Sequence, residues 1–191
     1  MATLGEIAEA VEAARGAGCP DPILLKCTSS YPSDPTDSHL RTIPHLRECF
    51  GTEVGLSDHT QGIGVAIAAV ALGASVIEKH LTLDRGHGGP DAAFSLEPEE
   101  FRRLAEETRR SWRALGRVRY GPTPSERGSL AHRRSLYVVE DLPPGAVLTA
   151  DNVRAVRPGA GLAPKYYPLL LGKKVNRPVR RGEPLAWEMI G

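Results

Sequence analysis

The sequence contains few cysteines and no long apolar run, and each shortage excludes a class of protein. Its three cysteines form an odd number, and none lies in a CxxC pair or a disulfide-framework spacing. Reduced thiols of this kind are typical of the cytoplasm rather than of secreted disulfide scaffolds. No stretch approaches the ~20 apolar residues of a membrane-spanning helix, and the N-terminus has no apolar core of a signal peptide. We therefore expect a cytoplasmic protein with no membrane segment.

The sequence also lacks a strong net charge and the common nucleotide and hydrolase motifs. A net charge of +1 argues against non-specific nucleic-acid binding. GxGxxG, P-loop, HExxH and GxSxG patterns are absent, so neither nucleotide binding nor serine hydrolysis is indicated. The charge is uneven, however: residues 1–60 carry 9 acids and 4 bases, whereas residues 123–191 carry 6 acids and 11 bases. A basic C-terminal segment is suited to an anionic ligand or to an acidic partner surface.

Helical and strand patterns alternate through the first 120 residues. Residues 3–17 have the spacing of an amphipathic helix, with Thr3 as its cap and Glu6 three residues later. Further helices are predicted at 39–50, 61–74 and 97–116, and apolar strands in "PILLKCTSSY", "EVGLSDHT" and "SVIEKHLTL". Such alternation predicts parallel strands with right-handed crossovers. The pattern fits either a doubly wound sheet or part of a (β/α)8 barrel.

The amino-acid composition changes near "YGPTPSERGS", a stretch that is rich in proline, glycine and serine. Beyond it, short β-rich runs are interrupted by Pro-Gly turns, a pattern typical of a small β domain. We therefore predict a barrel-type domain at 1–120, a linker at 121–130 and a compact, mostly-β domain at 131–191.

Polar side chains follow two of the predicted strands where each strand ends. On extended backbone Ser57 shares a face with His59, and Glu78 shares a face with His80. Because the carboxyl ends of parallel strands meet at one edge of a sheet, these four side chains are expected to gather there. Two neutral imidazoles with a carboxylate and water suit a divalent ion such as Mn2+. The alternative is that each histidine only caps its strand end through a hydrogen bond.

Five other residues are also candidates for a site, and three of them have two interpretations. Lys26 fits an anion site or a structural ion pair, and Cys27 a nucleophile or, preferably, a small strand residue. Asp91 follows glycines that let backbone approach a ligand, and is suited to binding sugar hydroxyls, whereas His87 in the same loop reads as a solvated residue. Arg157 precedes a tight turn and fits either an acidic substrate or solvent.

Several motifs together resemble the bacterial sialic acid synthase family: "LLKCTSSYP", "GLSDHT", "GASVIEKHLTLD", "GGPDAAFSLEPEEF" and "RPGAGL". "RRSLYVVEDL", "GLAPKYY" and "LGKK" are most similar to its pseudaminic acid synthase branch. The resemblance implies an α/β fold: a partial (β/α)8 TIM barrel comprising about the last three strands, followed by a small antifreeze-like SAF domain of the β-clip type. It also implies condensation of phosphoenolpyruvate with an N-acetylated amino sugar and water, which gives a nine-carbon 2-keto acid and phosphate.

The resemblance assigns roles to individual residues. It implies that His59 and His80 bind a divalent metal, Mn2+ or Mg2+, and that Glu78 activates water or moves protons. The residues that it places against phosphoenolpyruvate or the sugar are Ser57, Ser29, Tyr31, Asp91 and Arg157. Of these, Ser29 replaces an asparagine of some members, and Arg157 corresponds to the SAF arginine that reaches the neighbouring subunit's active site in the family's dimer.

The chain departs from the family in resembling only the back half of the barrel. We therefore expect a truncated gene product or one part of a split gene, active only if the missing half is supplied in trans. The expected partner is a second copy in a homodimer or a complementing N-terminal half chain. Three strands cannot close a barrel, and an open strand edge invites pairing with another chain. Two alternatives remain. One is an N-acetylneuraminate or legionaminate synthase fragment, and the other is a non-catalytic remnant whose SAF domain binds sugar or protein.

Overall fold

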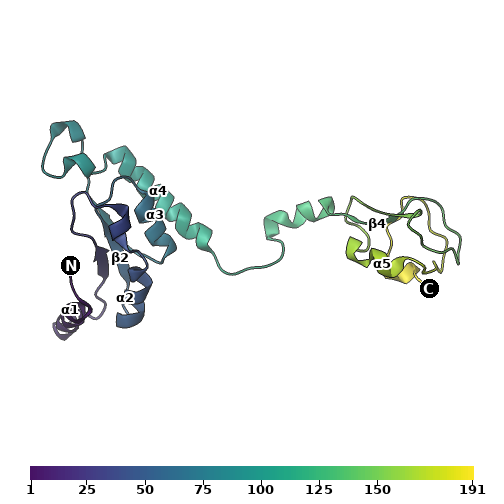
Figure 1. Cartoon of the computed structure of the whole chain (residues 1–191), viewed down its shortest axis with the longest axis horizontal. Coiled ribbons are helices and arrows are strands. Elements are labelled where there is room, and N and C mark those ends of the chain that lie inside the picture. Colours follow the sequence, from purple (N-terminus) through teal and green to yellow (C-terminus); the bar gives the residue numbers. More distant parts are fainter. The chain divides into compact units, whose positions relative to one another are not determined.

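A three-stranded parallel sheet organises residues Met1–Val118, the first of two units into which the chain divides. The computed structural model describes residues 1–191, and Figure 1 shows its elements. The strands are β1 (Leu24–Cys27), β2 (Val54–Asp58) and β3 (Ile77–Lys79), in the order β1-β2-β3. The parallel strands of the predicted mixed α/β fold are confirmed. β1 is shorter than its apolar run predicts, because only its last apolar residues pair with β2.

Four helices accompany this sheet: α1 (Leu4–Gly16), α2 (Thr42–Phe50), α3 (Gly64–Ala71) and α4 (Pro98–Leu115). α1 begins at the predicted capping box, in which the Thr3 hydroxyl accepts from the Glu6 N–H while the Glu6 carboxylate accepts from the Thr3 N–H. α2 and α3 bury small and branched side chains against β2, which is buried along its whole length. α4 buries only Leu104 fully and carries a charged outer face, as its amphipathic pattern predicts.

Short helical turns fill the connections that the sequence indicates as loops. η1 (Pro35–Ser38) follows β1, and η2 (Arg85–His87) and η3 (Ala92–Phe94) lie in the long polar segment after β3. Arg85 anchors that segment to the start of α4 through ion pairs with Glu97 and Glu100. The segment therefore has a defined path beside the carboxyl end of the sheet.

Residues Arg119–Gly191 form the second unit, around β4 (Ser135–Val138) and β5 (Val153–Val156). These two strands are antiparallel, and isolated antiparallel bridges join the surrounding loops, for example Leu142 with Val179. Short helices η5 (Pro164–Tyr166), α5 (Tyr167–Leu170) and η6 (Trp187–Met189) complete the unit. Ten buried residues form its core: Leu136, Val138, Leu142, Leu148, Val153, Leu170, Val175, Val179, Leu185 and Met189.

The stretch predicted as a linker contains a helix of its own. η4 (Pro124–His132) starts at Thr123, whose hydroxyl and backbone N–H both donate to the Glu126 carboxylate. Proline and serine are therefore first-turn residues of a short helix within this stretch. Along the whole chain, no helix combines the length and apolar character needed to cross a bilayer.

Candidate functional site

One row of polar side chains crosses the sheet near its carboxyl end. The register aligns Cys27 with Ser57 and Ser57 with Glu78, so all three lie on the same face. The Ser57 hydroxyl is buried and donates a 2.6 Å hydrogen bond to Glu78 Oε1. The hydrogen bond from Ser57 fixes the Glu78 carboxylate. Because the Glu78 residue is exposed, its carboxylate remains accessible to a ligand. The pairing of these two side chains agrees with the face-sharing that strand geometry predicts.

The two predicted metal-binding histidines lie next to each other just beyond β2 and β3. The ring centroids of His59 and His80 are 5.1 Å apart and their planes meet at 76°. His59 is buried, and its Nδ1 lies 2.9 Å from the Thr28 carbonyl oxygen. A proton on Nδ1 satisfies that carbonyl and leaves the Nε2 lone pair free, which is the arrangement of a metal-ligating imidazole with an oriented tautomer.

Two aromatic rings enclose this histidine pair. The Tyr31 ring centroid lies 4.4 Å from that of His59, and the Phe94 ring centroid lies 5.1 Å from that of His80. Tyr31 is half exposed, whereas Phe94 is buried. Phe94 was not predicted as a site residue, because one aromatic residue in a long polar loop gives no signal of where it packs. The rings supply an apolar wall beside the polar groups.

The other predicted sugar contacts of the first unit lie around the same pair. Asp91 Oδ2 is 3.6 Å from His80 Nδ1, a charge-pair distance that exceeds a hydrogen bond. The Asp91 backbone is held by the Ser95 hydroxyl, which donates to its carbonyl at 2.7 Å. Ser29 is exposed, and its hydroxyl lies 4.0 Å from Cys27 Sγ. Ser29 and Asp91 therefore flank the histidines from loops after β1 and β3.

A buried ion pair on the opposite face was missed by the sequence reasoning. Lys79 Nζ lies 2.8 Å from Asp58 Oδ2, and both side chains are 1% exposed. Lys79 also donates to the Thr60 carbonyl at 2.5 Å, and the Thr60 hydroxyl donates to Asp58 at 2.7 Å. The signal was present in "SDHT" and "EKH", because alternation forces the residue between two site residues to the other face. This pair ties the ends of β2 and β3 together beneath the histidines.

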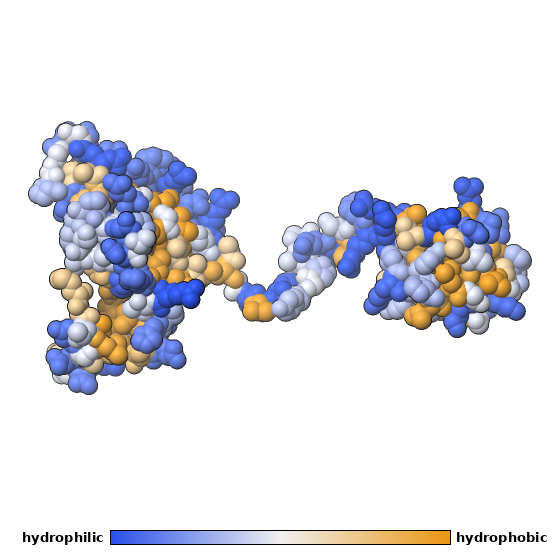
Figure 2. Space-filling view, viewed as in Figure 1, coloured by the Kyte–Doolittle hydropathy of each residue, from blue (hydrophilic) through white to orange (hydrophobic).

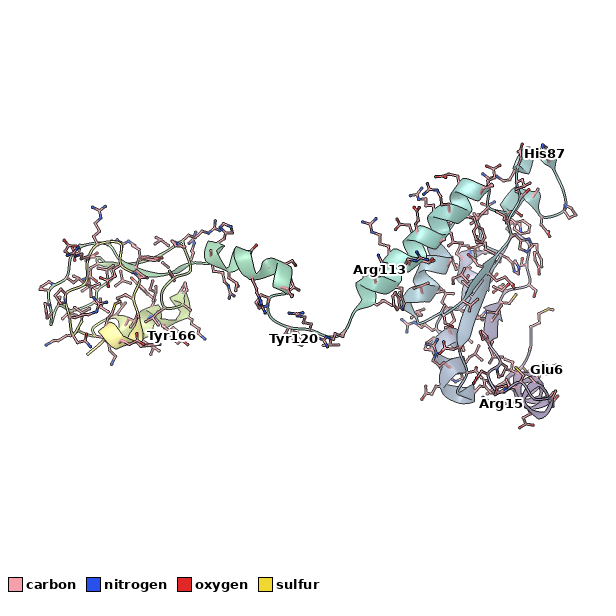
Figure 3. The ribbon with its side chains drawn as sticks, turned by 180° about the vertical axis from the view of Figure 1, so that it is seen from behind. Glu6, Arg15, His87, Arg113, Tyr120 and Tyr166 are labelled. Carbon is pink, nitrogen blue, oxygen red and sulfur yellow. The ribbon has the colours of Figure 1, made fainter.

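Three residues with open interpretations are placed by the structure. Lys26 pairs in register with Leu56, on the face opposite Ser57, and donates to the Thr28 hydroxyl at 3.1 Å. Burial lowers the pKa of this lysine. His87 lies at the tip of its loop, 81% exposed, with only Asp84 nearby (Figure 3). Arg157 belongs to the second unit, where it lines a cleft.

The donor set of the first unit fits part of a metal site. The chain contains no cluster of three or more His, Cys, Asp or Glu side chains that could hold a metal ion. His59 fits a ligand position, since its Nδ1 faces the Thr28 carbonyl and its Nε2 remains for a cation, and His80 fits a second position beside it. A divalent ion such as Mn2+ takes further oxygen ligands, which water or substrate would supply.

Comparisons with known proteins agree over almost the whole chain. The NeuB family model matches residues 1–120, and the SAF domain model matches residues 133–191. Pseudaminic acid synthase of Campylobacter jejuni is 42% identical over 87% of this chain and 48% of its own length. N,N'-diacetyllegionaminic acid synthase of Campylobacter jejuni is 38% identical over 96% of this chain and 56% of its own length.

A solved structure is similar in the same way. The N-acetylneuraminic acid synthetase of Leptospira borgpetersenii, crystallised with citrate, has a TM-score of 0.61 and 39% identity. The match covers 68% of this chain and 45% of that one. The chain spans about half the length of the curated relatives it matches.

Proposed function

The chain belongs to the NeuB family and carries an SAF domain, and from that premise we propose that it provides the C-terminal part of a pseudaminic or sialic acid synthase. The reaction proposed joins C3 of phosphoenolpyruvate to the aldehyde carbon of an N-acetylated amino sugar, adds water and releases phosphate. One observation carries the proposal: the His59–His80 pair and the Ser57–Glu78 hydrogen bond gather at the carboxyl end of parallel strands.

A partial (β/α)8 barrel is the architecture that we propose for the first unit. Three parallel strands cannot close a barrel, and β1 has no partner on its outer edge. Beside α4 lies a groove of about 1060 Å3 that includes Phe101, Trp112 and Leu115, and Trp112 is 66% exposed. Figure 2 shows hydrophobic surface on this unit. We place the remaining barrel strands against this edge and groove, on polypeptide outside these 191 residues.

The proton chemistry is assigned to Glu78. Its carboxylate accepts the Ser57 hydroxyl hydrogen bond through Oε1, which leaves Oε2 to accept a proton from the attacking water. Ser57 is correspondingly the proposed contact to phosphoenolpyruvate. Tyr31 and Phe94 form an apolar wall on one side of the proposed site.

A divalent cation, Mn2+ or Mg2+, is proposed at the free Nε2 atoms of His59 and His80. When bound, it would polarise the aldehyde oxygen of the sugar. Sugar hydroxyls are proposed to meet Ser29, Tyr31 and Asp91. These few contacts do not select among pseudaminic, legionaminic and sialic precursors, so the absent strands must contribute to that choice.

Arg157 is proposed as a substrate contact supplied by the second unit. The proposed partner is a second copy of the chain or a complementing half chain, and activity would require the missing half of the barrel. The competing proposal is a non-catalytic remnant, and the chain's lack of a complete three-ligand metal cluster is the observation that favours it.

Reconstitution distinguishes these proposals. The purified chain is mixed with the part of Campylobacter jejuni pseudaminic acid synthase that precedes the region matched here. Phosphate release from phosphoenolpyruvate is measured with each candidate amino sugar and Mn2+. We expect release only when both polypeptides and a sugar are present.

Matched variants assign the activity to this chain's residues. Glu78→Gln and His59→Ala/His80→Ala are expected to abolish phosphate release, while His87→Ala, which removes an exposed histidine of the same unit, leaves it unchanged. A reconstituted complex that assembles but releases no phosphate, or that works equally well with Glu78→Gln, would overturn the proposal.

A further inference from the structure

We propose that the second unit contains an anion site of its own, which takes a small molecule bearing at least two phosphate or carboxylate charges. The site is a cleft of about 790 Å3 between the end of η4 and the loop 157–165. Its basic lining residues are His132, Arg133, Arg134, Arg157 and Lys165. The inference goes beyond the proposed condensation, because Arg157 is the one lining residue that the two proposals share, and the site needs no residue of the first unit.

The cleft concentrates positive charge without an internal counter-charge. No acidic residue lines it, and none of its arginines or its lysine forms an ion pair. Elsewhere in the same unit Arg177 is paired with Glu183 at 2.6 Å. Cations that converge on one concavity repel each other, and a bound anion removes that repulsion. The planar forks of arginine match phosphate and carboxylate oxygens in bidentate geometry.

The wall that carries Arg157 is held in place before any ligand binds. The Ser135 hydroxyl, in a residue only 1% exposed, donates to the Pro158 carbonyl at 2.8 Å and accepts the Gly161 N–H at 2.9 Å. The Tyr137 hydroxyl donates to the same Pro158 carbonyl at 3.0 Å. Binding an anion would therefore require little ordering of this loop, which favours affinity.

Glycine allows this loop to lie against the segment that carries the other arginines. A Cβ atom at Gly159 would lie 3.0 Å from the Leu130 carbonyl oxygen and 3.2 Å from Arg133 Cβ. The Gly159 N–H donates to the Ala131 carbonyl at 3.1 Å. This close approach is what brings Arg157 to the same cleft as Arg133 and Arg134.

The size and lining favour a small anion over a nucleic acid. The volume lies within the range of about 300–1,000 Å3 typical of small-molecule sites. None of the lining residues is a phenylalanine, tyrosine or tryptophan, so the cleft lacks the large aromatic platforms on which successive bases stack. A compact ligand with clustered negative charges can contact more of the cleft's basic side chains at once than a nucleic-acid strand can.

The test is a titration of the full chain at low ionic strength, followed by amide chemical shifts. Inorganic phosphate, phosphoenolpyruvate and citrate serve as three probes, which distinguish phosphate from carboxylate recognition. We expect saturable shifts at Gly159, Gly161 and their neighbours. Arg134→Gln and Lys165→Gln should each weaken binding about tenfold, because each removes one charge-assisted contact.

Lys173→Gln is the matched control, since it removes the same charge from the same unit outside the cleft. It should change the dissociation constant by less than about twofold. Equal weakening by the control, an absence of saturation, or tighter binding of a single-stranded oligonucleotide would each overturn the proposal. The His59→Ala/His80→Ala chain should bind the anion normally, so failure of the proposed condensation and failure of this site are separate outcomes.

Discussion

The cores of the two units differ in the side chains that they bury. The ten core residues of Arg119–Gly191 form one cluster that contains no alanine. The first unit has two smaller clusters, and three of their nine buried residues are alanines: Ala66, Ala69 and Ala74. Since buried apolar area is the main stabilising term, the second unit has the more self-sufficient core. In the first unit the large apolar side chain of Trp112 is exposed beside a groove.

The units also differ in where their charged side chains lie and in whether these are paired. The first unit buries one complete ion pair, Asp58 with Lys79, at the end of its sheet. The second unit leaves its clustered cations at the surface of a cleft without partners. A buried pair fixes geometry, whereas unpaired cations at a concave surface are available to a ligand. The comparison therefore assigns a structural role to one set of charges and a binding role to the other.

The largest effect is expected from breaking the buried pair of the first unit. Lys79→Met leaves the Asp58 carboxylate buried without a partner, which costs about 3–5 kcal/mol. In urea unfolding only the transition of the first unit should move. Trp112 and Trp187 lie in different units, so single-tryptophan variants report the two transitions separately by fluorescence. Arg177→Met, in an exposed pair, is the control and should cost less than about 1 kcal/mol.

A similar loss is expected in the second unit from a cavity in its core. Leu136 is 0% exposed, so Leu136→Ala should destabilise by about 2–5 kcal/mol and move only the transition reported by Trp187. Leu169→Ala, at a site that is 61% exposed, should have little effect. If Leu136→Ala also shifted the transition of the first unit, the two cores would not be independent.

A smaller effect is expected at the exposed groove of the first unit. Trp112→Gln should change the free energy of unfolding by no more than about 0.5 kcal/mol, because its side chain is already in solvent. It should nevertheless reduce self-association in sedimentation velocity, since it removes apolar surface from an uncovered face. The same substitution at Trp187 should leave association unchanged. Equal association of wild type and Trp112→Gln would contradict this interpretation of the groove.

The smallest effect concerns pH and the second unit. Hydrogen bonds from the Arg177 side chain and the Arg180 N–H lower the pKa of Glu183. A lowered pKa means that this carboxylate stabilises the fold above its unfolded pKa of about 4.3, and that the contribution is lost as the pH falls through the folded value. The melting temperatures of wild type and Glu183→Gln should therefore differ at neutral pH and converge on acidification. A difference in melting temperature that grows at low pH would contradict the predicted sign of this linkage.

Much of the fold follows from local patterns that are visible in the sequence. The Thr3–Glu6 capping box and the amphipathic spacing of α4 predict those helices, since caps and periodicity act within a few residues. Alternation along a strand predicts that Ser57 shares a face with His59 and Glu78 with His80, whereas the hydrogen bond between Ser57 and Glu78 depends on strand register. Within the stretch predicted as a linker, a proline starts a short helix, which the composition of that stretch did not indicate.

Sequence by itself determined the family, the parallel strands and the histidines at the strand ends, because each depends on short-range patterns or on motifs. Only tertiary structure decided that Phe94 closes the histidine pair, that Lys79 neutralises Asp58, and that two separate segments of the second unit form one basic cleft. These features join residues far apart in the chain. Their meeting is set by packing and by strand register, which no local pattern encodes.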